Sequence, residues 1–243
     1  MDLQGTTALV TGATAGIGRA TAEALAADGA HVLVAGRDAD RAAEVVEAIA
    51  AAAGRARAVT VDLTAPGGVD DLLERAGEHG PLDVLVNNAG TYAFLPTADT
   101  DRQTFDAMVD LNVRVPFFLT AAVGREMAAR GRGKIVNISS VAAHVGTPSS
   151  AAYGASKAAL ESLTRSWATE FGPHGVNVNA VAPGPTHTLG TSAFRSGVEV
   201  MMKDSPAGRP AEPAEIAQAV LFLVRNDFAH GTTVVVDGGL AIS

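Results

Sequence analysis

Short apolar runs alternate with longer stretches of helical periodicity, and no other feature of the sequence restricts the fold as strongly. Runs rich in valine, leucine and isoleucine are typical of strands buried on both faces. Repeated strand–helix–strand units predict an α/β fold with one seven-stranded parallel sheet flanked by helices. We expect strands at Thr7–Thr11, His31–Ala35, Ala58–Val61, Val84–Asn87, Lys134–Ser139, Asn177–Ala182 and Thr233–Val236. We expect helices at Ile17–Ala27, Ala39–Ala53, Gly68–Glu78, Gln103–Ala129, Ala152–Phe171 and Pro213–Val224.

The composition narrows the functional classes. With 243 residues, the chain fits one α/β domain, so we expect residues 1–243 to form a single domain. A formal net charge of −8 disfavours nucleic-acid binding, and the absence of cysteine excludes disulfides and thiolate catalysis. The histidines are spaced too irregularly for a histidine-pair metal site. The first residues have no basic region and no long apolar stretch, which disfavours a secretory signal, and Ala219–Val224 is too short to span a bilayer. We therefore expect a cytoplasmic protein without a membrane partner.

A glycine-rich turn follows the first expected strand and opens the first expected helix. It reads Thr11-Gly12-Ala13-Thr14-Ala15-Gly16-Ile17-Gly18, with the spacing Gly-x-x-x-Gly-x-Gly. Glycine permits a tight turn and the close approach of a pyrophosphate, and the helix N-terminus offers free N–H groups. The turn predicts a dinucleotide site, and the alternative is a turn without a ligand. The residues assigned to it are Gly12, Thr14, Ala15, Gly16, Ile17 and Gly18.

Tyr153 and Lys157 lie four residues apart in an expected helix, which places them on one face, one turn apart. A free phenol has a pKa of about 10, and a neighbouring ammonium lowers that pKa. A tyrosine tuned in this way can exchange a proton with an alcohol oxygen. Ser140 follows an expected strand, at the carboxyl edge where open α/β sheets bind ligands. These residues predict an acid–base site in which Ser140 hydrogen-bonds a substrate oxygen; a chance pairing on a helix is the alternative.

The sequence Asn137-Ile138-Ser139-Ser140, the Tyr-x-x-x-Lys pair and the glycine turn together resemble the short-chain dehydrogenase/reductase family, over essentially the whole chain. The resemblance implies a doubly wound Rossmann-type domain and hydride transfer between a nicotinamide and a ketone or secondary alcohol. It makes Tyr153 the general acid or base and Ser140 the group that stabilises the substrate oxygen. It also implies that Lys157 lowers the tyrosine pKa and binds the nicotinamide ribose. The backbone carbonyl of Asn112 would hold a water that links Lys157 to solvent; a surface asparagine is the alternative.

The same resemblance extends the cofactor site to the ends of three further strands. Asp62 and Leu63 would hold the adenine ring, although an aspartate there also suits an ordinary strand-end turn. The Asn-Asn-Ala-Gly stretch at 87–90 matches a family signature that lies close to the ribose and braces the central strands; a generic Asn-Gly turn is the alternative. A Pro-Gly pattern after the sixth strand implies contacts with the nicotinamide carboxamide or the pyrophosphate. The residues implied at these last two places are Asn88, Ala89, Gly90, Pro183, Gly184, Thr186 and Thr188.

The end of the second expected strand bears on the choice between NAD(H) and NADP(H). NAD-binding folds usually carry an acid about 20 residues beyond the glycines, where it accepts from the ribose 2′-hydroxyl. Here the strand ends in Gly36-Arg37, and a planar guanidinium suits a 2′-phosphate. Asp38 is expected to cap the next helix. Many NADP-preferring family members also carry a basic residue in the glycine turn, where this chain has Ala15. We expect NADP(H), and NAD(H) is not excluded.

Residues 186–205 have a mixed composition and are expected to form a lid over the substrate; a pair of amphipathic helices is the alternative. Further candidates for the pocket are Tyr92, His144, Val145, Ser150 and His187.

Four basic residues gather near the fifth expected strand, namely Arg125, Arg130, Arg132 and Lys134. They complement a helix C-terminus, and this interpretation is preferred to a docking patch for an acyl carrier protein. The family resemblance implies a homotetramer. We therefore expect an NADP(H)-dependent ketone/alcohol oxidoreductase. A 3-oxoacyl-[acyl-carrier-protein] reductase is the alternative, and a non-catalytic nucleotide-binding scaffold ranks below both.

Overall fold

The computed structural model describes residues 1–192 and 195–242. The strands are β1 (Thr7–Thr11), β2 (His31–Gly36), β3 (Arg55–Thr60), β4 (Val84–Asn87), β5 (Gly133–Ile138), β6 (Val176–Pro183) and β7 (Thr233–Val236). The α-helices are α1 (Gly16–Ala27), α2 (Ala39–Ala51), α3 (Gly68–Gly77), α4 (Arg102–Val109), α5 (Val115–Arg130), α6 (Ala151–Phe171), α7 (Arg195–Met202) and α8 (Pro213–Arg225). The strands form one parallel sheet in the order β3-β2-β1-β4-β5-β6-β7. This confirms the α/β Rossmann-type fold predicted from the sequence.

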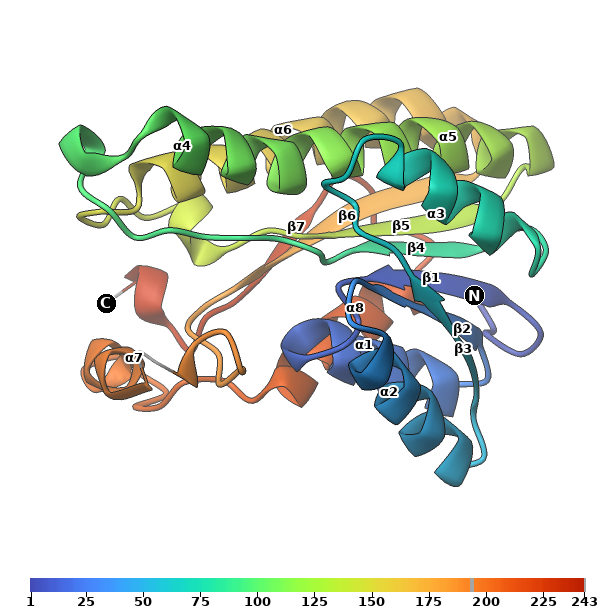
Figure 1. Cartoon of the computed structure of the whole chain (residues 1–243), viewed down its shortest axis with the longest axis horizontal. Coiled ribbons are helices and arrows are strands. Elements are labelled where there is room, and N and C mark those ends of the chain that lie inside the picture. Colours follow the sequence, from blue (N-terminus) through green and yellow to red (C-terminus); the bar gives the residue numbers. More distant parts are fainter. Residues whose placement is uncertain (193–194, 243) are drawn as a thin grey trace.

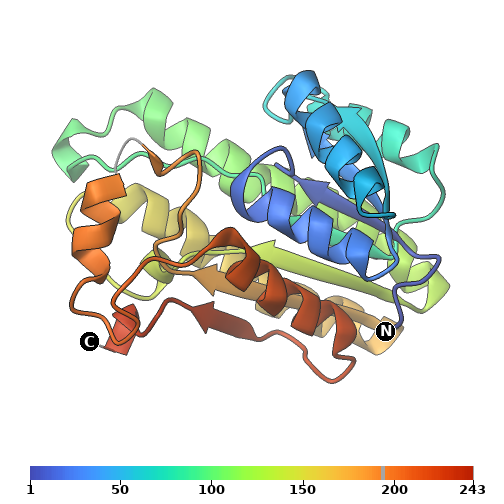
Figure 2. The same cartoon turned by 90° about the horizontal axis from the view of Figure 1, so that it is seen from below.

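Helices cover both faces of the sheet (Figure 1). α1, α2 and α8 lie on one face, and α3, α4, α5 and α6 lie on the other. The chain runs outward from β1 to β3, returns to β4 on the other side of β1, and continues outward to β7. In doubly wound sheets, ligands bind outside the carboxyl ends of the strands where the order reverses, which here is between β1 and β4. α7 lies beyond the end toward which β5, β6 and β7 run (Figure 2).

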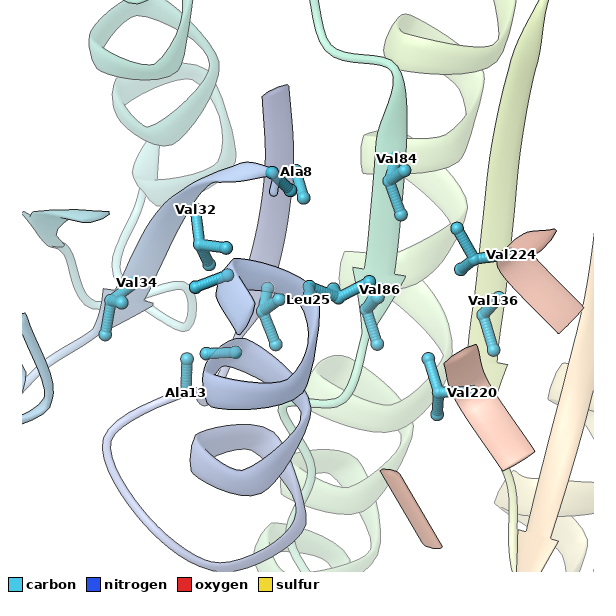
Figure 3. Packing of buried hydrophobic residues seen from close by; sticks show 14 of the residues in the cluster. Ala8, Ala13, Leu25, Val32, Val34, Val84, Val86, Val136, Val220 and Val224 are labelled. Atoms are coloured by element: carbon cyan, nitrogen blue, oxygen red, sulfur yellow. The ribbon is translucent and has the colours of Figure 1, made fainter. Parts of the chain in front are cut away.

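Alternate residues of each central strand point to opposite faces, which explains the unbroken apolar runs in the sequence. Val84 and Val86 of β4 pack in one cluster with Leu25 of α1 and Val220 of α8 (Figure 3). Leu85, which lies between these valines, belongs to a second cluster on the opposite face of the sheet. Both faces of the sheet are therefore core.

The third strand begins earlier than expected, at Arg55 rather than Ala58. β3 is an edge strand, and its whole length pairs with β2 in register from His31↔Arg55 onward. An edge strand can carry charged side chains on its open side, so Arg55 and Arg57 remain exposed. Because these residues are charged, a prediction based on apolar runs missed the first half of the strand.

The single helix expected at Gln103–Ala129 is divided by a π-helical turn at Asp110–Arg114, between α4 and α5. In a regular α-helix, the residue at position 116 would donate its N–H to the carbonyl of Asn112. Pro116 has no N–H, so this carbonyl lacks its α-helical partner. Turns of this kind occur frequently at functional sites.

Residues Arg102–Arg130 are long and apolar enough, by length and composition alone, to cross a membrane. In the structure this stretch comprises α4, the π-helical turn and α5. Leu119, Val123 and Met127 of α5 are buried in the second core cluster. Core helices of globular proteins pass the same length and composition test, and burial against the sheet accounts for these apolar residues.

Candidate active site

The glycine turn lies at the switch point, between β1 and α1. Gly12 and Gly16 have φ angles of +63° and +53°, which favour glycine. A Cβ atom on Gly12 would lie 2.9 Å from Cα of Ala89, and one on Gly16 would lie 3.0 Å from Cγ2 of Thr188. The side chain of Ala15 does not cap α1. The N–H groups of the first turn of α1 therefore suit a phosphate, and residues from three separate segments meet around it.

Thr11 and Asn88 hold the glycine turn in place, and the sequence had not singled out Thr11. The Thr11 hydroxyl accepts hydrogen bonds from the N–H groups of Asn88 and Ala89, both at 3.0 Å. The Asn88 side-chain amide donates to the carbonyls of Thr11 (2.8 Å) and Gly12 (3.1 Å). A Cβ atom on Gly18 would overlap the Gly12 carbonyl and this amide. The side chain of Asn88 thus braces the turn, and the sequence signal for Thr11 was a hydroxyl residue at a strand end.

Ser140, Tyr153 and Lys157 lie together just beyond the end of β5. The side chain of Ser140 lies close enough to the Tyr153 hydroxyl to lower the pKa of the phenol. Lys157 Nζ lies 5.9 Å from the centre of the Tyr153 ring and donates to the carbonyl of Ile138 at 2.8 Å. Ser140 also caps a short 3₁₀ turn, where its Oγ accepts from the N–H of Ala142 at 3.2 Å. The structure therefore brings together the three side chains that the sequence assigned to one acid–base site.

The pKa values of Tyr153 and Lys157 are shifted mainly by burial. Burial raises the pKa of the Tyr153 phenol, and the polar side chain of Ser140 lowers this pKa by a smaller amount. Burial lowers the pKa of Lys157 to about 8, because desolvation disfavours its charged form. Lys157 Nζ faces the aromatic ring, 5.9 Å from its centre. In the chain without a bound cofactor, burial thus dominates the shift of the phenol pKa, and the lowering of this pKa by Lys157 stays a prediction.

Asn112 lies in the π-helical turn and is fully buried, so it is not a surface residue. Its side chain accepts from the N–H of Thr91 (2.8 Å) and donates to the carbonyl of Thr91 (2.8 Å) and the hydroxyl of Ser156 (3.0 Å). A Cβ atom on Gly90 would lie 3.1 Å from Asn112 Oδ1 and 3.3 Å from Lys157 Nζ. Asn112 therefore joins the chain after β4 to the helix that carries Tyr153 and Lys157.

The end of β2 presents an exposed guanidinium. Arg37 takes part in no ion pair within residues 1–192 and 195–242. Asp38 caps α2 as expected, because it accepts from the N–H of Arg41 at 3.1 Å, and it also pairs with the Arg41 side chain at 3.2 Å. Asp62 accepts from the N–H (2.9 Å) and the hydroxyl (2.7 Å) of Thr64. These bonds, and more weakly the charge of Arg37, lower the pKa of Asp62.

The chain after β6 returns past the glycine turn. Thr186 is buried and bridges to Ala211, and the Thr191 hydroxyl donates to the Thr186 carbonyl at 2.9 Å. Thr191 also accepts from the N–H of Thr188 at 2.9 Å. A Cβ atom on Gly184 would meet the backbone of residue 237. Gly184 therefore lies against the chain after β7, and Pro183 pairs with Val236 at the end of β7, whereas Thr188 faces the glycine turn.

The segment expected to form a lid contains α7, and its residues 193 and 194 lie outside the described residues. A cavity of about 520 Å³ separates this segment from α1 and the start of α8. Its lining includes Gly16, His187, Thr188, Leu189 and Arg195. The segment and the glycine turn thus line the same cavity.

The other pocket candidates are scattered. The Tyr92 ring lies 6.2 Å from the Tyr153 ring, edge to face. His144 Nε2 lies 2.9 Å from a carboxylate oxygen of Glu161. Ser150 is buried and donates to the Thr147 carbonyl at 2.8 Å, so its hydroxyl is engaged away from a ligand. Across the described ranges, no three histidine, aspartate or glutamate side chains lie where they could hold a metal ion together.

The basic residues near β5 are largely engaged. Lys134 is buried and pairs with Asp227 at 2.6 Å. Arg132 pairs with Asp83 at 3.3 Å, and Arg130 donates to a backbone carbonyl. These contacts favour a structural role for the cluster over a docking patch.

The fold and the site define a Rossmann-type nucleotide-binding domain with a serine–tyrosine–lysine cluster at its ligand-binding edge. The family model for short chain dehydrogenases matches residues 6–199. The chain belongs to the short-chain dehydrogenase/reductase family. It is therefore an oxidoreductase that acts on alcohol and carbonyl groups with a nicotinamide cofactor.

Relatives with named activities align over nearly the whole chain. Gluconate 5-dehydrogenase of Gluconobacter oxydans is 38% identical, and the alignment covers 100% of this chain and 97% of the relative. Cyclopentanol dehydrogenase of a Comamonas species is 37% identical, with 95% of each chain covered. The two names describe a sugar acid and a cyclic alcohol, so they differ in substrate.

Solved structures agree with the fold in detail. A protein assigned as a β-ketoacyl-ACP reductase has a TM-score of 0.89 and 47% identity, and covers 99% of this chain and 100% of its own. A protein from Beutenbergia cavernae, assigned as an NAD(P)-dependent gluconate 5-dehydrogenase, was solved with NADP bound at low occupancy. It has a TM-score of 0.93 and 38% identity, with 100% of this chain and 99% of its own covered.

Proposed function

We propose that this protein is an NADP(H)-dependent oxidoreductase that interconverts a ketone and a secondary alcohol. The observation that carries the proposal is the cluster of Ser140, Tyr153 and Lys157, which lies at the carboxyl edge of the sheet, near a glycine turn suited to a pyrophosphate. When bound, the reduced nicotinamide would supply the hydride that joins the carbonyl carbon in reduction, and the oxidised nicotinamide would accept the hydride that leaves the alcohol carbon in oxidation.

Each residue of the cluster has a separate task. In reduction, the O–H bond of Tyr153 breaks and its proton passes to the carbonyl oxygen; in oxidation, Tyr153 accepts the proton. Ser140 donates a hydrogen bond to the same oxygen and stabilises its developing charge. Lys157 holds the nicotinamide ribose and, when charged, favours the phenolate. The Asn112 carbonyl, which lacks its α-helical donor because of Pro116, supports a water between Lys157 and solvent.

The cofactor is held, in this proposal, by the glycine turn and the ends of β2, β3, β4 and β6. Asp62 accepts from the adenine, and the Leu63 N–H donates to it. The 88–90 stretch lies along the ribose, and the chain after β6 orients the nicotinamide carboxamide. The full set is Gly12, Thr14, Ala15, Gly16, Ile17, Gly18, Arg37, Asp62, Leu63, Asn88, Ala89, Gly90, Tyr153, Lys157, Pro183, Gly184, Thr186 and Thr188.

The Tyr153→Phe variant tests the reaction, because it removes the hydroxyl and keeps the ring. We expect turnover of a panel of ketones with NADPH to fall by about 10²–10⁴-fold, since the general acid is lost. NADPH affinity, measured by fluorescence titration, should stay within about threefold. Ser166→Ala, which removes an exposed hydroxyl from the same helix, serves as a matched control and should retain turnover. Unchanged turnover in Tyr153→Phe would refute the assignment. NADPH binding without turnover of any substrate by the wild-type protein would favour the non-catalytic scaffold.

The preference for NADP(H) depends on Arg37, which is exposed and forms no ion pair among the residues that the structure describes. We expect Arg37→Ala to weaken NADPH binding about tenfold and to leave NADH binding unchanged, because only NADPH carries a 2′-phosphate. Arg41→Ala is the matched control, since Arg41 is already paired with Asp38. Tighter binding of NADH than of NADPH by the wild-type protein would reverse the preference.

A 3-oxoacyl-[acyl-carrier-protein] reductase is the second candidate, because one similar structure is assigned that activity. The engaged state of Lys134 and Arg132 weighs against a docking patch for an acidic carrier. Salt-sensitive activity on a carrier-bound substrate would support this candidate. A strong preference for free ketones would oppose it.

We further propose that residues 1–243 form one domain, that residues 186–205 close over the substrate, and that four copies assemble. Apolar side chains stand exposed on α5 and α8, including Phe117, Phe118 and Phe222. Such surfaces are commonly covered by other copies of the same chain. Sedimentation equilibrium should give four times the mass of the chain, and a monomer would refute the assembly.

The expected compartment is the cytoplasm, which cell fractionation would test.

A further inference from the structure

Two aromatic side chains flank the catalytic phenol on the segment that follows β4. The Phe94 ring lies 5.8 Å from the Tyr153 ring at 74°, and the Tyr92 ring lies 6.2 Å from it at 71°. Tyr92 and Phe94 are themselves 5.4 Å apart and tilted by 37°. The edge-to-face arrangement is one that aromatic rings favour. Tyr153 thus forms one side of an aromatic group, called here the aromatic wall, made of Tyr92, Phe94 and Tyr153.

Within the aromatic wall, Tyr92 and Tyr153 are half-buried, and Phe94 is the exposed member. Phe94 is 54% exposed, although its ring contacts Tyr153. Leu95, the next residue, is 37% exposed, and Leu189 is 62% exposed. The Tyr92 hydroxyl donates to the carbonyl of Gly190, which joins the aromatic wall to the segment expected to form the lid. Exposed apolar side chains therefore lie on the segment whose rings contact Tyr153 and on the segment that is hydrogen-bonded to Tyr92.

Exposed apolar surface beside a reactive group is suited to an apolar ligand. A polyhydroxylated substrate would place hydroxyl groups against ring surfaces. Each hydroxyl left without a hydrogen-bond partner would cost about 1–3 kcal/mol of binding free energy. A carbocyclic ring loses no hydrogen bond there and gains dispersion and edge-to-face contacts. Tyr92 has one hydroxyl, and the lid segment already uses it.

We propose that the substrates are ketones and secondary alcohols in which the reacting carbon belongs to, or adjoins, an alicyclic or aromatic ring. This ring packs against Phe94 and Tyr92. This inference rests on the proposed function and specifies its substrate class. In reduction the hydride reaches the ring carbonyl carbon, and the Tyr153 proton reaches its oxygen, so the product is a cyclic or benzylic secondary alcohol.

The test compares kcat/KM for cyclohexanone and α-tetralone with kcat/KM for 5-ketogluconate, using NADPH. We expect the ring ketones to be favoured by at least about 100-fold. In Phe94→Ala, kcat/KM for α-tetralone should fall about tenfold or more, whereas kcat/KM for hydroxyacetone should change less than about threefold. The matched control is Phe228→Ala, because Phe228 is 97% exposed and lies far from the site. Its neighbour Asp227 accepts a hydrogen bond from Asn177 at the start of β6, whereas the site lies at the carboxyl ends of the strands.

The outcomes separate this inference from the proposed function. Efficient reduction of 5-ketogluconate with little activity on ring ketones would overturn the substrate class and leave the reaction standing. Equal losses for α-tetralone and hydroxyacetone in Phe94→Ala would also overturn it, because they would indicate general damage to the site. No turnover of any ketone, with NADPH bound, would instead refute the proposed function.

A second, independent observation concerns Glu161, a buried carboxylate that the proposed chemistry does not use. Glu161 lies one helical turn beyond Lys157 on α6 and is 6% exposed. One of its oxygens accepts from the Ser139 hydroxyl at 2.6 Å and lies 2.9 Å from His144 Nε2. Ser139 immediately precedes Ser140. Ser140 caps the start of the 3₁₀ turn, and His144 follows its end.

Glu161 therefore binds both ends of the turn that carries Ser140. Between these ends, the Ala142 carbonyl lies against α6 so closely that a Cβ atom on Gly154 would lie 2.5 Å from it. The turn is thus fixed to the helix that carries Tyr153 and Lys157 at three places. Since catalysis depends on group positions to within about 1 Å, the placement of the Ser140 side chain beside Tyr153 depends on this attachment.

We infer that Glu161 is a positioning residue that sets the Ser140 hydroxyl relative to the Tyr153 hydroxyl. Like the substrate class, this inference rests on the proposed function. Glu161→Ala should lower kcat about tenfold or more, with KM for NADPH within about twofold, because Glu161 itself is not among the proposed cofactor contacts. Glu161→Gln keeps an oxygen that accepts from Ser139 and His144, and should restore most of kcat. Glu170→Ala, an exposed carboxylate on the same helix, is the matched control and should change nothing.

A merely structural role predicts a different pattern. If Glu161→Ala lowers the melting temperature and the folded fraction keeps wild-type kcat, the positioning role is wrong. If kcat and NADPH affinity fall together, the carboxylate supports the whole site rather than Ser140. Wild-type turnover that is abolished in Tyr153→Phe establishes that the proposed function holds in either case.

Discussion

The two sides of the site are built in opposite ways. The floor, defined as Thr11, Asn88, Asn112 and Lys157, is held by hydrogen bonds between buried or half-buried groups at 2.8–3.3 Å. The mouth, defined as Tyr92, Phe94, Leu95 and Leu189, consists of apolar side chains that stand partly or largely exposed. Buried polar networks fix one geometry, because every unpaired member is expensive. Exposed apolar contacts impose no such condition, so the mouth can vary while the chemistry stays constant.

The largest expected effect tests whether burial in the floor lowers the pKa of Lys157. The pKa of Lys157, about 8, lies below the ordinary lysine value of 10.5, so between these pH values the unfolded chain keeps a proton that the folded chain has released. Stability therefore rises with pH across this window. For the cofactor-free protein, the unfolding free energy of wild type relative to Lys157→Met should rise by about 3 kcal/mol between pH 7 and pH 10.5. Urea titrations of both proteins measure it, and a difference that does not vary with pH would contradict a desolvated lysine.

A smaller effect is expected from Thr11→Val, which keeps the shape and removes the hydroxyl. The N–H groups of Asn88 and Ala89 would lose their acceptor, so we expect a loss of about 2 kcal/mol in unfolding free energy. Thr11→Ser, which keeps the hydroxyl, is the control and should recover most of this loss. Denaturant unfolding decides the question. Equal stability of Thr11→Val and wild type would mean that the floor does not depend on these bonds.

The smallest effect is expected at the mouth. Tyr92→Phe removes only the hydroxyl that donates to the Gly190 carbonyl at an exposed position. We expect the unfolding free energy to change by less than about 0.5 kcal/mol. A loss as large as that of Thr11→Val would erase the contrast between floor and mouth.

The fold was predictable because its signals are local. Apolar runs mark both buried faces of the sheet, and glycine marks the turns that need positive φ. β3 shows the limit, since Arg55 and Arg57 pair as strand residues on an open edge that carries no apolar signal. The division of the long helix had a signal in Pro116, which removes the donor to the Asn112 carbonyl. Its consequence, a π-helical turn, depends on packing against α6.

For the site, the sequence supplied the residue types and the structure supplied their surroundings. The spacing of Tyr153 and Lys157 placed them on one helix face, but only the tertiary fold decided that Lys157 meets the ring and that burial raises the tyrosine pKa. Glu161 and Phe94 had no motif to mark them, because their partners lie far away in the chain. Sequence spacing determines what happens within one helix or turn. Contacts between distant segments, and the desolvation they produce, arise only when the chain has packed.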